Sequence, residues 1–185
     1  MPAVLEQKVT GLEATRVRRR LIGRFGEPAP GPPEVAAGLR LPPAPEILAA
    51  LPYHAFHPLG LEQRRAQTII RLAGRASALE RLAARPGPEA RARLEALPGV
   101  GPWTAAETVR VALGDPDAVS VGDFHLPDLV SWALAREARG DDRRMLELLE
   151  PYRGQRARVQ RLLEASGIAA PRFGPRRSAR SIVGI

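Results

Sequence analysis

A glycine-rich turn between two helical patterns constrains the fold of this chain more than any other feature. Residues 97–105 read Leu-Pro-Gly-Val-Gly-Pro-Trp-Thr-Ala. Two glycines, Gly99 and Gly101, allow the backbone to turn sharply and to expose its amides at the start of the next helix. Amides placed in this way point toward an anion, for which a phosphate is the natural candidate. The run therefore predicts two helices joined by a tight, anion-binding turn.

Helical spacing of apolar residues accounts for most of the remaining chain. It predicts one long amphipathic helix over Val4–Phe25, which carries a cluster of arginines. Seven prolines within residues 27–45 predict an irregular surface connection. No stretch has convincing strand alternation, so the fold class is all-α. Further helices are expected at Glu46–Leu51, Leu61–Ala73, Ser77–Ala84, Glu89–Leu97, Thr104–Leu113, Pro127–Ala135, Asp142–Leu149 and Gln155–Ala165.

The composition limits the classes of partner and site. The 185 residues carry 28 Lys and Arg against 20 Asp and Glu, a net charge of +8 that favours a polyanionic partner or, alternatively, an ordinary basic protein. The absence of cysteine excludes disulfides, thiolate zinc sites and cysteine-ligated iron–sulfur clusters. With neither a spanning segment nor a signal pattern, we expect no membrane partner and a cytoplasmic location.

A second motif follows the turn, where residues 121–126 read Val-Gly-Asp-Phe-His-Leu and Asp123 lies 22 residues beyond Gly101. The turn at 97–105 resembles the hairpin signature of the helix-hairpin-helix DNA glycosylase superfamily, and this second segment resembles the one that carries the superfamily's aspartate. The two together are more specific than either alone. The resemblance implies an all-α, two-lobed helical fold with Asp123 in a cleft between the lobes.

Asp123 is the catalytic residue that this resemblance implies. Breaking an N-glycosidic bond leaves an oxocarbenium-like sugar, which a carboxylate stabilises while it orients the attacking water. The alternative role is an ordinary helix N-cap before Leu126 and Pro127. His125 is interpreted as a helix-end histidine rather than a general base. Three other acids nearby are interpreted as structural: Asp115, Asp117 and Asp128.

The similarity to bacterial 3-methyladenine DNA glycosylase II extends over about Val4–Gly167. It implies a glycosylase domain at residues 1–167. Residues 168–185 carry four arginines and no acidic residue, which predicts a basic, flexible tail that touches DNA loosely. Near the N-terminus the similarity implies that Gln7 or Lys8 fills the gap left by an extruded base, the alternative being an exposed polar helix face. Further matches are interpreted as aids to the fold: Gly60, Leu61, Arg65, Ala66 and residues 150–156.

Four departures from the family refine the prediction. Relatives with lyase activity carry a hairpin lysine where this chain has Trp103, so a Schiff-base mechanism is not expected. Endonuclease III-like relatives carry a four-cysteine cluster that is missing here. Trp103 and Glu107 are assigned to the base pocket, although Glu107 stands where the resemblance leads us to expect a tyrosine. The small β-rich domain that precedes the family's helices is also missing, which suggests a fragment or a minimal form.

The sequence thus predicts a monofunctional glycosylase that flips and excises damaged, alkylated purines from double-stranded DNA in base excision repair. We expect a monomer associated with the nucleoid, without a metal site or dissociable cofactor, although carbonyls of residues 97–101 could hold a monovalent cation. The alternative is a non-catalytic helix-hairpin-helix DNA-binding module. The residues assigned to DNA binding are Gln7, Lys8, Leu97, Gly99, Val100, Gly101 and Thr104.

Overall fold

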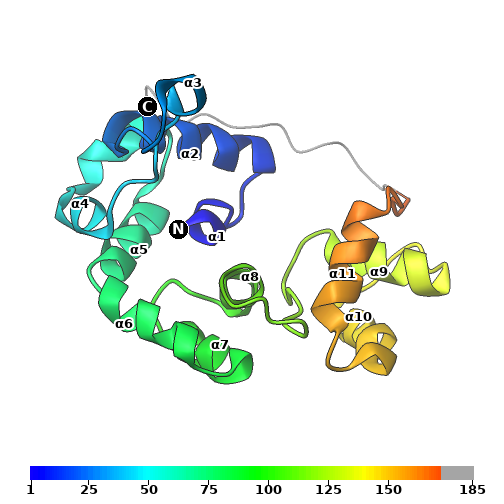
Figure 1. Cartoon of the computed structure of the whole chain (residues 1–185). Helices are drawn as coiled ribbons and strands as arrows, with labels where there is room; N and C mark the ends of the chain where they lie inside the picture. Colours follow the sequence, from blue (N-terminus) through cyan, green and yellow to red (C-terminus); the bar gives the residue numbers. More distant parts are fainter. Residues whose placement is uncertain (172–185) are drawn as a thin grey trace. The chain divides into compact units, whose positions relative to one another are not determined.

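The computed structural model describes residues 1–171, which form helices and loops without a β-strand (Figure 1). The all-α prediction is confirmed for this range. No helix within it is long and apolar enough to cross a membrane. Its α-helices are α1 (Pro2–Leu5), α2 (Gly11–Phe25), α3 (Pro33–Ala36), α4 (Pro45–Ala50), α5 (Gln63–Ala73), α6 (Ala76–Glu80), α7 (Gly87–Glu95), α8 (Pro102–Ala112), α9 (Leu126–Ala135), α10 (Asp142–Leu149) and α11 (Arg156–Ala165), and its 3₁₀ turns are η1 (Tyr53–Ala55), η2 (His57–Leu59), η3 (Arg81–Ala84) and η4 (Glu150–Tyr152).

The described chain divides into two compact units, with the boundary between Arg81 and Leu82. The first unit holds α1 to α6, and the second holds α7 to α11. The glycosylase domain that the sequence predicts for residues 1–167 spans both units, and residues 168–171 belong to the second. Most of the predicted basic tail, residues 172–185, lies outside the described residues.

The first unit corrects the prediction of one helix over Val4–Phe25. Two helices, α1 and α2, are separated by a turn in which Lys8 has a φ of 56°. A left-handed residue cannot continue an α-helix. Thr10 then caps α2: its side chain accepts the Glu13 N–H, and the Glu13 carboxylate accepts the Thr10 N–H at 2.8 Å. This reciprocal cap is the Thr-x-x-Glu pattern of a helix start, so the sequence carried the signal.

An apolar core holds α1, α2, α4 and α5 together around the fully buried Phe56 of the first unit. Arg65 of α5 is also buried, and it donates to the carbonyl oxygen of Leu5 at 2.5 Å and pairs with Glu62. It thereby links α5 to α1, as expected for an aid to the fold. The buried apolar residues are Val4, Leu5, Ala14, Val17, Leu21, Leu48, Phe56, Leu59, Leu61, Ala66 and Ile69.

The proline-rich segment is irregular, as predicted, but contacts with the rest of its own backbone hold it in place. It folds back on itself through an isolated bridge between Pro28 and Arg40, and it includes the single turn α3. Gly26 lies where this segment meets the end of α2, and a Cβ added there would lie 2.1 Å from the Leu41 carbonyl oxygen. Only glycine permits so close a backbone approach.

In the second unit, α7 packs against α8, and α9 packs against both α10 and α11. An apolar cluster of Val119, Leu126, Val130, Met145 and Leu149 underlies the segment that carries Asp123. This cluster gives α9 and the loop before it a rigid support.

Asp117 ties the turn after α8 to the start of α11. Its carboxylate accepts the Arg156 N–H at 3.0 Å and pairs with the Arg156 guanidinium. These contacts hold the pKa of Asp117 below its ordinary value, chiefly through the side-chain hydrogen bond from Arg156. Asp117 is thus structural in its contacts, and so is Asp128, which accepts the Gly140 N–H at 2.9 Å.

Candidate active site

The predicted hairpin lies between α7 and α8, both in the second unit (Figure 1). The Val100 N–H donates to the Leu97 carbonyl oxygen at 3.0 Å, which closes the turn. Gly99 has a φ of 88°, in the left-handed region that glycine adopts without strain. Pro102 is the first residue of α8, where its missing N–H costs nothing.

The hairpin residues divide into buried side chains and exposed backbone. Val100 and Thr104 are buried, and Leu97 is half-buried, so these three side chains mainly fix the turn. Gly99 and Gly101 are exposed, and a Cβ at Gly101 would meet no atom within 4 Å. This open backbone at a helix N-terminus suits a phosphate ligand.

Asp123 is held by three N–H donors. Its Oδ1 accepts the backbone N–H groups of His125 at 2.8 Å and Leu126 at 2.9 Å. Its Oδ2 accepts the indole Nε1–H of Trp103, also at 2.9 Å. One carboxylate oxygen therefore accepts the N–H groups at the start of α9, although His125, and not Asp123 as the alternative proposed, occupies the N-cap position. The other is bonded to the hairpin helix, and an ionised carboxylate retains further lone pairs for a ligand.

A contact with the start of α10 also fixes the loop before Asp123. Gly122 has a φ of 88°, and its N–H donates to both carboxylate oxygens of Asp142, at 3.0 and 3.1 Å. Asp142 is the first residue of α10. The sequence placed Asp142 only at a helix start, so this contact with Gly122 was missed.

Two exposed rings follow Asp123. Phe124 is 84% exposed, and its ring meets the ring of His125 edge to face at 4.8 Å between centroids. His125 occupies the N-cap position of α9, which agrees with a helix-end histidine. The sequence had not singled out Phe124.

Glu107 belongs to a polar network on the inner side of α8. Its side chain is 14% exposed, pairs with Arg110 at 2.5 Å and accepts a hydrogen bond from the Ser120 hydroxyl. The buried Gln160 of α11 extends the network, because it accepts the Ser120 N–H at 3.2 Å and donates to Glu164 at 2.9 Å. No hydrogen bond in the described residues joins Glu107 to Asp123 or Trp103.

Comparison with known proteins identifies the fold. No protein-family model matches the sequence. Over 125 residues, 67% of the chain, it is 34% identical to a probable bifunctional transcriptional activator/DNA repair enzyme AlkA from Mycobacterium tuberculosis. The matched region covers 24% of that relative, so the chain spans about a quarter of its length.

Solved structures match over more of the chain. A 3-methyladenine DNA glycosylase from Archaeoglobus fulgidus gives a TM-score of 0.74 at 23% identity, covering 88% of this chain and 55% of that one. A 3-methyladenine DNA glycosylase from Schizosaccharomyces pombe, in complex with abasic DNA, gives 0.73 at 17% identity, covering 93% and 81%. The protein has the helix-hairpin-helix DNA glycosylase fold. The fold that the hairpin and the Asp123 segment led us to expect is confirmed.

The remaining residues assigned to DNA binding lie in the first unit of the glycosylase fold. Gln7 is half-buried, and Lys8 is exposed in the turn between α1 and α2. The left-handed backbone of Lys8 is uncommon for a residue with a side chain. Lys8 therefore lies at an exposed turn, not on the polar helix face that the sequence offered as the alternative.

Only some of the residues that the sequence assigned to the site are in contact with one another. Trp103 and Asp123 are in direct contact, and the hairpin residues adjoin Trp103 in sequence. Gln7 and Lys8 come from the other unit. Among the described residues, no group of three or more His, Asp or Glu side chains is arranged to hold a metal ion.

Proposed function

We propose that this chain is a monofunctional DNA N-glycosylase that flips damaged, alkylated purines out of double-stranded DNA and excises them. The observation that carries the proposal is the contact between Asp123 and Trp103, because it places a carboxylate beside the helix that starts at the anion-binding hairpin. The names of the relatives, a DNA repair enzyme and 3-methyladenine glycosylases, support the same reaction.

In the proposed reaction the bond between C1′ of the sugar and the base nitrogen breaks, and its electron pair leaves with the base. The Asp123 carboxylate stabilises the positive charge that develops on the sugar. A water then adds to C1′ and loses a proton, and the products are a free base and an abasic site. An alkylated purine suits this mechanism because a cationic base is a good leaving group.

The proposal is tested by incubating the protein with duplexes that each carry one damaged base and measuring the free base released. We expect release from alkylated purines and little from undamaged DNA. A panel of lesions defines the substrate class. Release confined to oxidised or deaminated bases would contradict the assignment to alkylated purines.

A lyase activity is not expected, because no hairpin lysine is available to form a Schiff base. Trp103 occupies that position, and Lys8 is the single lysine of the chain. Base excision should therefore leave an intact strand with an abasic site. Borohydride should trap no covalent adduct with DNA, and strand breaks should appear only after added alkali. A trapped adduct would contradict the monofunctional assignment.

DNA affinity should depend steeply on salt. The net charge of +8 and the hairpin backbone both favour contacts to phosphates rather than to base edges. Raising the salt from about 50 to about 200 mM should weaken duplex binding by more than tenfold if several phosphates are neutralised. The measurement is a fluorescence-anisotropy titration on undamaged duplex. A loss smaller than twofold would contradict electrostatic binding.

A second candidate function is a non-catalytic DNA-binding module. The observation in its favour is that Glu107 is bonded to Arg110 and Ser120, where a stacking ring was expected. Both functions share the phosphate contacts, so binding alone does not separate them. Base release does, because the binding module would leave damaged duplex intact.

The proposed reaction uses no dissociable cofactor. A monovalent cation held by carbonyls of residues 97–101 remains a proposal, tested by comparing duplex affinity in potassium and in lithium salts at equal ionic strength. We also propose that the protein acts as a monomer and, as a DNA-repair enzyme, is associated with the nucleoid. Light scattering on the complex with one short duplex tests the first of these.

A further inference from the structure

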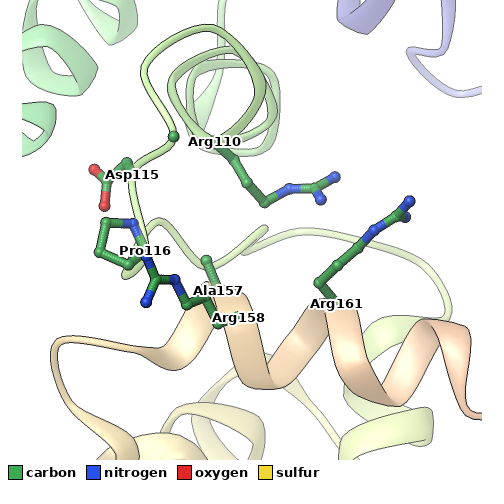
Figure 2. A pocket seen from close by; sticks show the side chains of 7 residues that line it. Arg110, Asp115, Pro116, Ala157, Arg158 and Arg161 are labelled. Atoms are coloured by element: carbon green, nitrogen blue, oxygen red, sulfur yellow. The ribbon is translucent and has the colours of Figure 1, made fainter.

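Arginines from two helices line a pocket of about 180 Å³ in the second unit. The pocket lies toward the C-terminal end of α8, about 10 Å along the helix from Trp103 at 1.5 Å per residue. Figure 2 shows Arg110 extending from α8 and Arg161 from α11 toward the same side, with Arg158 beside Pro116. The charged lining groups are three guanidiniums and one carboxylate, that of Asp115, and two of the guanidiniums, those of Arg110 and Arg161, pair with glutamates outside the lining.

The partners of these arginines do not account for all of their charge and donors. Arg110 pairs with Glu107, which also binds Ser120, and the Arg110 Nε is buried without a hydrogen-bond partner in the described residues. A buried donor without an acceptor destabilises the fold. The guanidinium of Arg110 thus has hydrogen-bonding capacity that the described chain does not use.

The two arginines of α11 are also incompletely paired. Arg158 and Arg161 are three residues apart on α11, and Figure 2 shows their side chains extending to different sides, Arg158 toward Pro116 and Arg161 toward the side of Arg110. Arg161 pairs with Glu164 at 3.5 Å while its own side chain is 69% exposed. Arg158 takes part in no ion pair within residues 1–171. A bound anion would supply the partner that Arg158 lacks.

The walls of the pocket are fixed by backbone contacts. The N–H groups of Ala157 and Arg158 donate to the Pro116 carbonyl oxygen at 2.9 and 3.3 Å. Asp115 is held in the same turn, since its Oδ1 accepts the Asp117 N–H at 2.9 Å. The arginines therefore extend from a preorganised frame, which lowers the cost of binding.

We propose that this pocket binds a phosphate group and is a second anion site, separate from the hairpin. Guanidinium groups match the oxygens of a phosphate with paired N–H donors. The phosphate can belong to the DNA backbone or to a small phosphate-containing molecule. Both sources share the same chemistry, and the experiment distinguishes them.

The test uses inorganic phosphate as the probe and follows backbone amide NMR shifts of the whole chain at constant ionic strength. Phosphate should shift residues 114–116 and 157–161 in a saturable manner. Arg158→Gln should weaken this binding about tenfold, the effect of one lost charge-assisted hydrogen bond. Arg143→Gln is the matched control, because Arg143 is an 85% exposed arginine on α10 outside the pocket. It should leave phosphate binding unchanged.

Equal effects of the two substitutions, or phosphate shifts confined to residues 99–104, would overturn the proposal. A second measurement identifies the source of the phosphate. If Arg158→Gln lowers the salt dependence of duplex binding by about one phosphate contact, the pocket binds the DNA backbone. If the salt dependence is unchanged, it binds a small phosphate compound. The phosphate titration contains no DNA, so its outcome is independent of the proposed glycosylase activity.

Discussion

Asp123→Asn should lower the rate of base release by about 10²-fold or more, the effect expected for losing a preorganised electrostatic contact with the cationic sugar. The asparagine oxygen can still accept the His125 and Leu126 N–H groups, so α9 stays capped. Its amide group would instead face the Trp103 indole N–H, donor against donor. We expect a small loss of stability and normal duplex binding, or slightly tighter binding because a negative charge is gone.

Single-turnover base release and the melting temperature, measured on the same Asp123→Asn preparation, separate catalysis from capping. A purely capping aspartate predicts nearly unchanged excision, since asparagine caps helices about as well as aspartate. Asp128→Asn serves as a control at a nearby carboxylate, because Asp128 accepts the Gly140 N–H and does not hold the loop of Asp123. Full excision activity in a folded Asp123→Asn protein would remove Asp123 from the mechanism.

Trp103→Phe should reduce excision by about tenfold while it leaves binding to undamaged duplex unchanged. Phenylalanine keeps an aromatic ring but removes the N–H that holds the Asp123 Oδ2, and a hydrogen bond to a charged group contributes about 1.5–3 kcal/mol. Trp103→Ala should lose more, because a ring that stacks on an extruded base contributes roughly 1–3 kcal/mol.

The pair of Trp103 variants separates three roles of the side chain. If Trp103→Phe excises as fast as the natural protein, the hydrogen bond to Asp123 does not matter for catalysis. If Trp103→Ala weakens damaged and undamaged duplex binding equally and lowers the melting temperature, Trp103 contributes to packing alone. Rate constants under single-turnover conditions and affinities for both duplexes provide these comparisons.

Local patterns predicted much of the fold and part of the site. The hairpin at residues 97–105 depends on the positive φ of Gly99 and the exposed backbone of Gly101, which are local properties, so its place in the chain was predictable. Most helices followed from apolar spacing. The break between α1 and α2 was missed because the apolar residues from Val4 to Phe25 keep a helical period across it. The Thr10 and Glu13 cap was the local signal that outweighed this period.

Contacts between distant segments could not be predicted in the same way. The indole of Trp103 and the carboxylate of Asp123 are 20 residues apart, and their hydrogen bond depends on how α8 packs beside the following loop. The bond from Gly122 to Asp142 and the network of Glu107 with Ser120 and Gln160 are likewise tertiary. Sequence identified Trp103 and Glu107 as neighbours on one helix, but it could not show that they have different partners.

The most direct test of the account is the release of free base from a duplex that carries a single 3-methyladenine analogue or from methylated duplex DNA. The natural protein and Asp123→Asn are compared with enzyme in excess over DNA, and the released base is separated by chromatography. The account predicts release by the natural protein, an abasic site in an unbroken strand, and about 10²-fold slower release by the variant. A natural protein that binds the methylated duplex but releases no base would contradict the glycosylase assignment and support the non-catalytic binding module.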